Sequence, residues 1–162
     1  MKSSKLLFLA SWVILLILSI GIAFSSAASM SNAYFGKNDQ LIPNGVTLEN
    51  IRAAGGEHGD EAVKAFRGRR ATAATWALCA ALLSIAIVLI PYRRGERWAW
   101  WALLAGIGIS QFLSLARAIF LGTTFGTAAP AIILAILLLG LLAGAPRMFK
   151  RHDEALEVSD VV

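Results

Sequence analysis

Four stretches of this chain contain no charged residue, and they determine the elements that the sequence predicts. They are residues 6–36, 71–92, 98–116 and 118–146, which together hold 101 of the 162 residues. A transmembrane helix needs about 20 mostly apolar residues to cross a hydrocarbon core about 30 Å thick. The pattern therefore predicts four spanning helices, at about residues 6–24, 72–90, 98–120 and 128–145.

The connections between these helices predict how they are arranged. Residues 91–97 and 121–127 are short links, so the helices that they join lie side by side in opposite directions. Pro91 is expected to end the second helix, because its ring cannot continue the hydrogen-bond ladder. The predicted fold is an all-α integral membrane protein, a single membrane domain built as an antiparallel four-transmembrane-helix bundle.

The long connection, residues 25–71, is predicted to be a partly helical outer loop. Within it, residues 47–54 are expected to form a short helix capped by Thr47, followed by a glycine-rich break. Asp60 is expected to cap a further helix that continues into the second span. At the other end of the chain, residues 146–162 are predicted to be a solvated cytoplasmic tail.

Composition excludes several classes of protein. Hydrophobic residues make up 57% of the chain and charged residues only 15%, whereas a soluble domain is nearer one half and one quarter. A soluble domain, a disordered chain and a nucleic-acid-binding domain are therefore excluded, although the net charge is +5. The basic residues lie beside the predicted spans, where the expected partners are membrane lipids with anionic headgroups. A spanning β-barrel is also excluded, because residues 132–139 show no alternation of apolar and polar positions.

The basic residues of the short loops predict the orientation of the chain. Loop 91–97 carries three arginines and loop 121–127 carries none, while basic residues flank both termini. Because such residues concentrate in cytoplasmic loops, the N- and C-termini are predicted to be cytoplasmic, in a multi-pass protein of the cell membrane.

The first span has an alternative explanation as a cleaved signal peptide. Basic residues precede it, and Ser25-Ser26-Ala27 resembles a cleavage site. Its apolar stretch is longer than the roughly 7–15 residues usual for a signal peptide, so the span is expected to be retained.

Aromatic residues follow the arginines of loop 91–97 directly and mark a membrane interface. The predicted interfacial anchors are Arg93, Arg94, Arg97, Trp98, Trp100 and Trp101. The run Arg93-Arg94-Gly95-Glu96-Arg97-Trp98-Ala99-Trp100-Trp101 resembles a juxtamembrane stretch of uncharacterised small multi-pass bacterial membrane proteins. The resemblance implies the topology and a bacterial inner membrane, and it implies no catalytic residue.

Small residues at four-residue spacing on the third and fourth spans let helix backbones approach closely. The predicted packing positions are Ala102, Gly106, Gly140 and Gly144. Packing within the bundle is the favoured role of these positions, and a subunit interface is the alternative.

The third span also carries a polar face that could hold a ligand or a lipid headgroup. Its members are Ser110, Gln111, Ser114 and Arg117. An arginine near the end of a span can extend to the headgroups, so an interfacial anchor with interhelical hydrogen bonds is the favoured explanation. An anion site, a headgroup site or a translocation path is the alternative.

Residues that could carry chemistry are few. The one metal-like cluster, Glu57, His58, Asp60 and Glu61, is flanked by glycines that leave it too flexible, so no metal site is predicted. No cofactor and no catalytic residue is predicted either, because the predicted spans contain no Asp, Glu or His. The single cysteine, Cys79, is expected to be a buried structural thiol.

Three classes of function follow from these observations. The favoured one is a non-catalytic membrane protein, an accessory subunit, assembly factor or scaffold that contacts other membrane subunits or further copies of itself. The second is a small carrier or channel for a neutral or anionic molecule or a lipid, centred on the polar face of the third span. The third is a lipid-modifying membrane enzyme.

Overall fold

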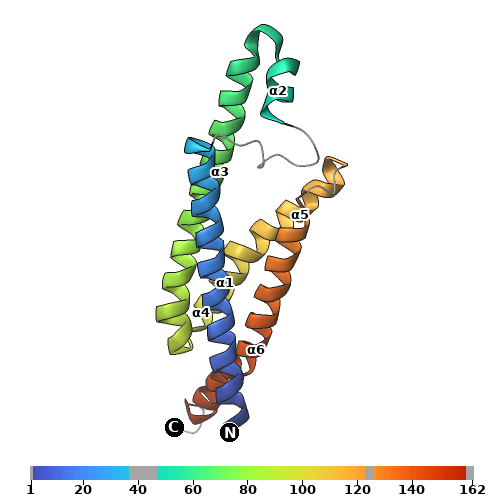
Figure 1. Cartoon of the computed structure of the whole chain (residues 1–162). Helices are drawn as coiled ribbons and strands as arrows, with labels where there is room; N and C mark the ends of the chain where they lie inside the picture. The colour runs from blue at the N-terminus through green and yellow to red at the C-terminus, as the bar shows by residue number, and fades with distance from the viewer. Residues whose placement is uncertain (1, 37–46, 123–125, 160–162) are drawn as a thin grey trace. The chain divides into compact units, whose positions relative to one another are not determined.

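The computed structural model describes the backbone of residues 2–36, 47–122 and 126–159, and the side chains of residues 5–36, 47–122 and 126–149. This described part of the chain is helical and contains no strand (Figure 1). Within it, four helices are long and apolar enough to cross a membrane: Lys5–Phe35, Gly56–Tyr92, Arg97–Phe120 and Ala128–Phe149. Each contains one of the four predicted spans.

The first helix, α1 (Lys2–Phe35), continues beyond residue 24, where the outer loop was expected to begin. Residues 25–35 contain neither glycine nor proline, so nothing interrupts the helix before Gly36. With 34 residues, α1 is about 51 Å long, which exceeds a hydrocarbon core of about 30 Å. Only part of α1 can therefore lie within a hydrocarbon core.

The two short helical elements of the outer loop lie close to where the sequence predicts them. Helix α2 (Leu48–Ala54) is capped by Thr47, whose Oγ1 accepts a hydrogen bond from the Asn50 N–H at 3.1 Å, which confirms that prediction. A short 3-10 turn, η2 (Gly56–His58), follows. Helix α3 (Gly59–Ile87) begins one residue before Asp60, which therefore lies in the first turn instead of at the cap.

Pro91 does not end the second span, contrary to the prediction. It lies inside a π-helical turn, η3 (Val88–Tyr92), and helical structure continues to Arg94. In a π turn, each N–H bonds the carbonyl five residues earlier instead of four. The helical hydrogen-bond pattern is therefore rearranged around the proline and resumes after it. The chain then reverses at Gly95, whose φ of 81° is one that residues with a side chain rarely adopt.

The third span is one continuous helix with a π-helical middle. It consists of α4 (Arg97–Leu103), η4 (Leu104–Ile109) and α5 (Ser110–Phe120). The last helix, α6 (Ala128–Ser159), carries Pro130 in its first turn, where a missing N–H costs little. It also continues past Pro146, so residues 146–159, expected to be a separate tail, extend the helix; residues 160–162 lie outside the described part.

The chain divides into two compact units, which are Met1–Ile20 with Leu82–Val162, and Gly21–Ala81. In the first unit, buried side chains of the spans form the core: Leu15, Val88, Tyr92, Leu103, Leu137 and Leu141. Arg97 contacts Phe149, and Gly108 lies beside Leu137, so the third span and α6 run antiparallel within this unit.

Glycines of α6 lie at the closest helix contacts of the first unit. A Cβ added to Gly140 would lie 2.9 Å from Leu15 Cδ2, and one added to Gly144 would collide with the Tyr92 hydroxyl and Ser11 Oγ. A side chain at Gly144 would therefore collide with buried groups, and one at Gly140 would require Leu15 to move.

Gly106 makes no close contact within the chain, and the alternative role predicted for it, a subunit interface, stays a prediction. A Cβ at Gly106 would meet no atom within 4 Å, whereas one at Gly108 would lie 3.6 Å from Leu137 Cδ2; Ala102 is half-buried. The reason is the π-helical η4, whose wider turns rotate the following residues around the helix axis. Residues four apart in sequence therefore do not stay on one face of the helix across η4.

Candidate functional site

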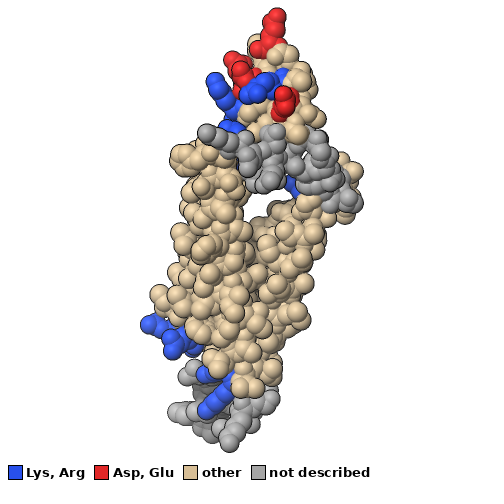
Figure 2. Space-filling view, in the orientation of Figure 1, with Lys and Arg blue, Asp and Glu red and all other residues tan. Residues whose placement is uncertain are grey.

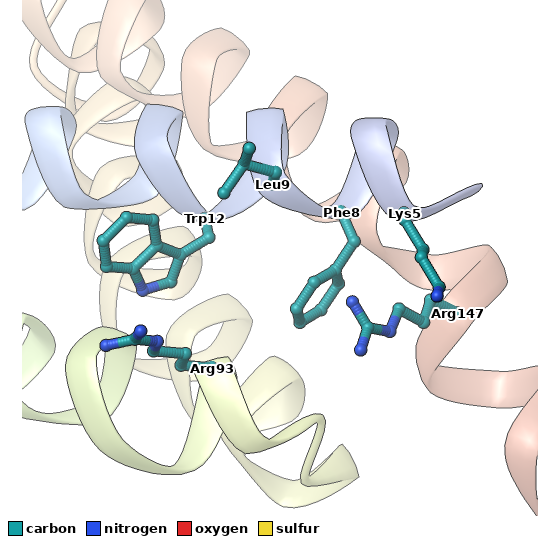
Figure 3. A pocket seen from close by; sticks show the side chains of 6 residues that line it. All are labelled: Lys5, Phe8, Leu9, Trp12, Arg93 and Arg147. Atoms are coloured by element: carbon teal, nitrogen blue, oxygen red, sulfur yellow. The ribbon is translucent and has the colours of Figure 1, made fainter. Parts of the chain in front are cut away.

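The first unit contains a pocket of about 380 Å³ (Figure 3). Three cationic and three apolar side chains line it: Lys5, Phe8, Leu9, Trp12, Arg93 and Arg147. We call these six residues the basic pocket. Its volume lies within the range of about 300–1,000 Å³ that is typical of small-molecule sites.

Three helix segments position these side chains. Lys5, Phe8, Leu9 and Trp12 are three, four and seven residues apart on α1, so they share one face of that helix. Arg93 follows directly after the π-helical turn η3, and Arg147 follows Pro146 in α6. The basic pocket therefore exists only because the start of α1, the end of the second span and the later part of α6 converge.

Aromatic ring faces hold the two arginines of the basic pocket. The Cζ atom of Arg147 lies 4.3 Å from the centroid of the Phe8 ring, and that of Arg93 lies 5.6 Å from the Trp12 ring. A guanidinium over a ring face is attracted by the ring quadrupole and keeps its in-plane N–H donors available. Figure 3 shows the Arg147 guanidinium directed toward the Phe8 ring, with the end of the Lys5 side chain beside the base of the Arg147 side chain.

A chain of buried hydrogen bonds holds Tyr92, the residue on which Phe8 of the basic pocket stacks. Ser11 Oγ donates to the Gly140 carbonyl oxygen at 2.6 Å and lies 2.5 Å from the Tyr92 hydroxyl. A carbonyl only accepts and a serine hydroxyl has one proton, so Tyr92 donates to Ser11. The Tyr92 ring also stacks on Phe8, with centroids 5.7 Å apart and planes 4° apart. We call Tyr92, Ser11 and Gly140 the buried hydrogen-bond chain.

Cations dominate the electrostatics of the basic pocket. Glu96 is the only carboxylate among the described side chains of the first unit, and it accepts a hydrogen bond from Trp98 Nε1 at 2.6 Å. No described carboxylate lies within 4.0 Å of the charged atoms of Lys5, Arg93 or Arg147. The arrangement therefore favours an anion in the basic pocket.

The predicted interfacial anchors separate into two groups. Four of them are exposed: Arg93, Arg94, Trp98 and Trp101. Arg97 and Trp100 instead turn inward and donate to α6 carbonyls, with Arg97 bonding Met148 and Phe149 at 3.2 and 2.8 Å and Trp100 bonding Leu141 at 2.9 Å. Pro146 has no N–H, so the carbonyl of Leu142, four residues earlier, lacks its usual helical donor. The Leu141 carbonyl that Trp100 bonds is the preceding one in the same helix.

The polar face predicted on the third span is not gathered around the basic pocket. Ser110 Oγ donates to the Ile107 carbonyl at 2.8 Å, and Ser114 Oγ donates to the Ser110 carbonyl at 2.9 Å. Gln111 Nε2 donates to Ser110 Oγ at 3.3 Å. These bonds stay within one helix, and Arg117 is exposed beside Gly126. The ligand role of this face stays a prediction.

Sequence reasoning missed the basic pocket because its residues come from three separate segments. The charge pattern alone indicates only that Lys5 and Arg147 flank spans and orient them. The one available signal was on α1, where a cation and two aromatic residues, Phe8 and Trp12, recur at helical spacing.

The second unit holds the residues that resemble a metal cluster. His58 Nδ1 lies 3.4 Å from Glu61 Oε2, and Asp60 Oδ1 lies 2.6 Å from Arg52 Nε. Among the described residues, no three His, Cys, Asp or Glu side chains are grouped to hold a metal ion. Cys79 is exposed, contrary to the prediction of a buried thiol, because that prediction applied the burial statistics of soluble proteins to an outward-facing apolar helix.

Comparison with known proteins gives no homology from which a function could be transferred. No family model, no curated protein and no solved structure matches this chain. Functional inference therefore rests on the chain's own residues.

Proposed function

We propose that this chain is a four-span integral membrane protein of the cell membrane with a non-catalytic role, as an accessory subunit, assembly factor or scaffold of a membrane complex. The low burial of its spans carries this proposal. Only between 17% and 28% of the most apolar window of each span is buried within the chain. Outward apolar faces of this extent are stable against lipid or partner helices and are rare on soluble monomers.

The proposed arrangement is an antiparallel bundle with both termini and loop 91–97 in the cytoplasm. Figure 2 shows Lys and Arg side chains gathered at the lower end, and the surface directly above them is uncharged. Within the first unit, Lys5, Arg93 and Arg147 converge on the basic pocket, and Arg94 adjoins Arg93 in the chain. Their concentration at one end supports the orientation, because cytoplasmic ends of spans are enriched in Lys and Arg.

A non-catalytic role is supported by what the spans contain and how their polar groups bond. The predicted spans hold no Asp, Glu or His for proton relay or metal binding. On the third span, the protons of Ser110 and Ser114 are already bonded within the helix. This reduces the support for a carrier centred on that span.

Insertion and orientation can be tested together in intact cells. We expect the chain to stay in the membrane after alkaline carbonate extraction. In a Cys79→Ala background, Glu57→Cys should react with an impermeant thiol reagent on whole cells, and Glu96→Cys should react only after lysis. Release by carbonate would reject the membrane assignment, and the reverse labelling pattern would reject the orientation alone.

The accessory role is tested by the mass of the complex extracted in a mild detergent. We expect a particle that contains a second protein in fixed stoichiometry with this chain. A particle that contains single chains and lipid alone would reject the accessory role.

A further inference from the structure

We propose that the basic pocket binds the phosphate group of an anionic phospholipid, whose acyl chains lie along the outward face of α1. The inference deepens the proposed function and rests on the chain being inserted in a membrane. It assigns a lipid site to Lys5, Arg93 and Arg147, residues that the charge pattern alone would treat as orienting charges.

The choice of a phosphate follows from the three cations. Each guanidinium presents a planar set of donors that matches two phosphate oxygens, and Lys5 adds an ammonium donor. Lys5 and Arg147 line the same pocket and have no described carboxylate within 4.0 Å of their charged groups, so an anion bound there would neutralise their charge. A zwitterionic headgroup would bring a fourth cation to the same place, so the lipid should carry net negative charge.

The choice of a lipid over a free phosphate follows from the apolar half of the basic pocket. Leu9 lines the pocket and is 56% exposed, so it continues the pocket onto the surface of α1. It belongs to an outward row that consists of Leu6, Leu9, Val13 and Ile17. These positions are three and four residues apart and share one helix face. A ligand with a phosphate at one end and acyl chains at the other fits both parts.

The support beneath the basic pocket is rigid. Phe8 is only 5% exposed and stacks on Tyr92, which is fully buried in the hydrogen-bond chain with Ser11 and Gly140. The Phe8 ring that positions Arg147 is therefore fixed before a ligand arrives. Such preorganisation lowers the entropy cost of binding.

The test measures lipid binding to the full-length chain in detergent by native mass spectrometry. The probes are phosphatidic acid and phosphatidylcholine with identical acyl chains, and inorganic phosphate as a soluble competitor. We expect phosphatidic acid to bind in preference to phosphatidylcholine. Arg93→Gln and Arg147→Gln should each weaken phosphatidic acid binding at least about tenfold, as expected for lost charge-assisted hydrogen bonds.

Arg94→Gln is the matched control, since it removes the same charge from an exposed position beside Arg93 that does not line the pocket. It should change binding less than about twofold, as expected for a screened surface charge. An equal loss for Arg94→Gln, or no loss for Arg93→Gln and Arg147→Gln, would overturn the site. If inorganic phosphate displaced phosphatidic acid with an affinity equal to that of the lipid, the lipid assignment would be overturned.

A conservative variant keeps the test valid if a glutamine variant is poorly folded. Arg147→Lys preserves the charge, and we expect it to lose part of the affinity because an ammonium lacks the planar pair of donors. Wild-type affinity in Arg147→Lys would contradict bidentate binding at this position. Binding in detergent and carbonate extraction are separate measurements, so failure of the site and failure of membrane insertion are distinguishable.

Discussion

The basic pocket with its adjoining buried hydrogen-bond chain, and the polar face of α5, both place arginine near hydroxyl-bearing residues, yet the two regions differ in how their hydroxyl groups are bonded. At the basic pocket, Ser11 and Tyr92 connect three helical segments and leave the cations above them directed into a cavity. On α5, Ser110 and Ser114 bond to carbonyls of their own span. Hydroxyl groups along one helix can therefore bond within that helix, whereas side chains from converging helix ends can line a pocket.

The largest effect is expected when a glycine is replaced with leucine. Gly144→Leu should lower the free energy of unfolding by about 3 kcal/mol, because its side chain would enter space occupied by Tyr92 and Ser11. Gly106→Leu should change it by less than about 0.5 kcal/mol, because that position is open. Thermal or denaturant unfolding in detergent measures both. A comparable loss for Gly106→Leu would show that another subunit packs there.

Removing the central hydroxyl should have the next largest effect. Ser11→Ala leaves the buried Tyr92 hydroxyl without its acceptor, so we expect a loss of about 1–3 kcal/mol in the same unfolding measurement. Ser114→Ala removes a bond to its own helix and should cost less than about 0.5 kcal/mol. Equal costs for the two variants would contradict the distinction between a bond that joins helices and one that stays within a helix.

A smaller change in stability is expected when phosphatidic acid binds. Phosphatidic acid at ten times its dissociation constant should stabilise the wild-type chain by about 1.4 kcal/mol through mass action. Arg147→Gln should abolish most of this stabilisation, and Arg117→Gln should retain it. Melting curves with and without the lipid provide the measurement. Loss of the stabilisation in Arg117→Gln alone would place the lipid on the third span.

The smallest effect is expected for Arg117→Lys. If Arg117 only extends to the headgroups, an ammonium reaches them equally well and stability should change by less than about 0.5 kcal/mol. The measurement is the melting temperature and the bound-lipid content of Arg117→Lys compared with wild type. A loss as large as that of Arg117→Ala would show that Arg117 holds a planar anion through two hydrogen bonds.

The sequence by itself determined the local features of this protein. Uncharged stretches located four long apolar helices, because the length and hydrophobicity of a helix are properties of contiguous residues. The Thr47 cap was predictable for the same reason, since its partner is the N–H three residues away. The end of α1 was misplaced because the change to small polar residues after residue 24 does not by itself stop a helix.

Only the tertiary structure decided which residues meet. The π-helical η4 moved the packing position from Gly106 to Gly108, an effect that four-residue spacing does not reveal. The basic pocket joins Lys5, Arg93 and Arg147, which lie far apart along the chain and carry no common motif. Their meeting depends on the close contact of α1 with Gly140 and Gly144, which is a property of complementary shapes. Periodicity within a segment therefore predicts the faces of a regular α-helix, while π-helical turns and the convergence of three helix ends depend on how the helices pack.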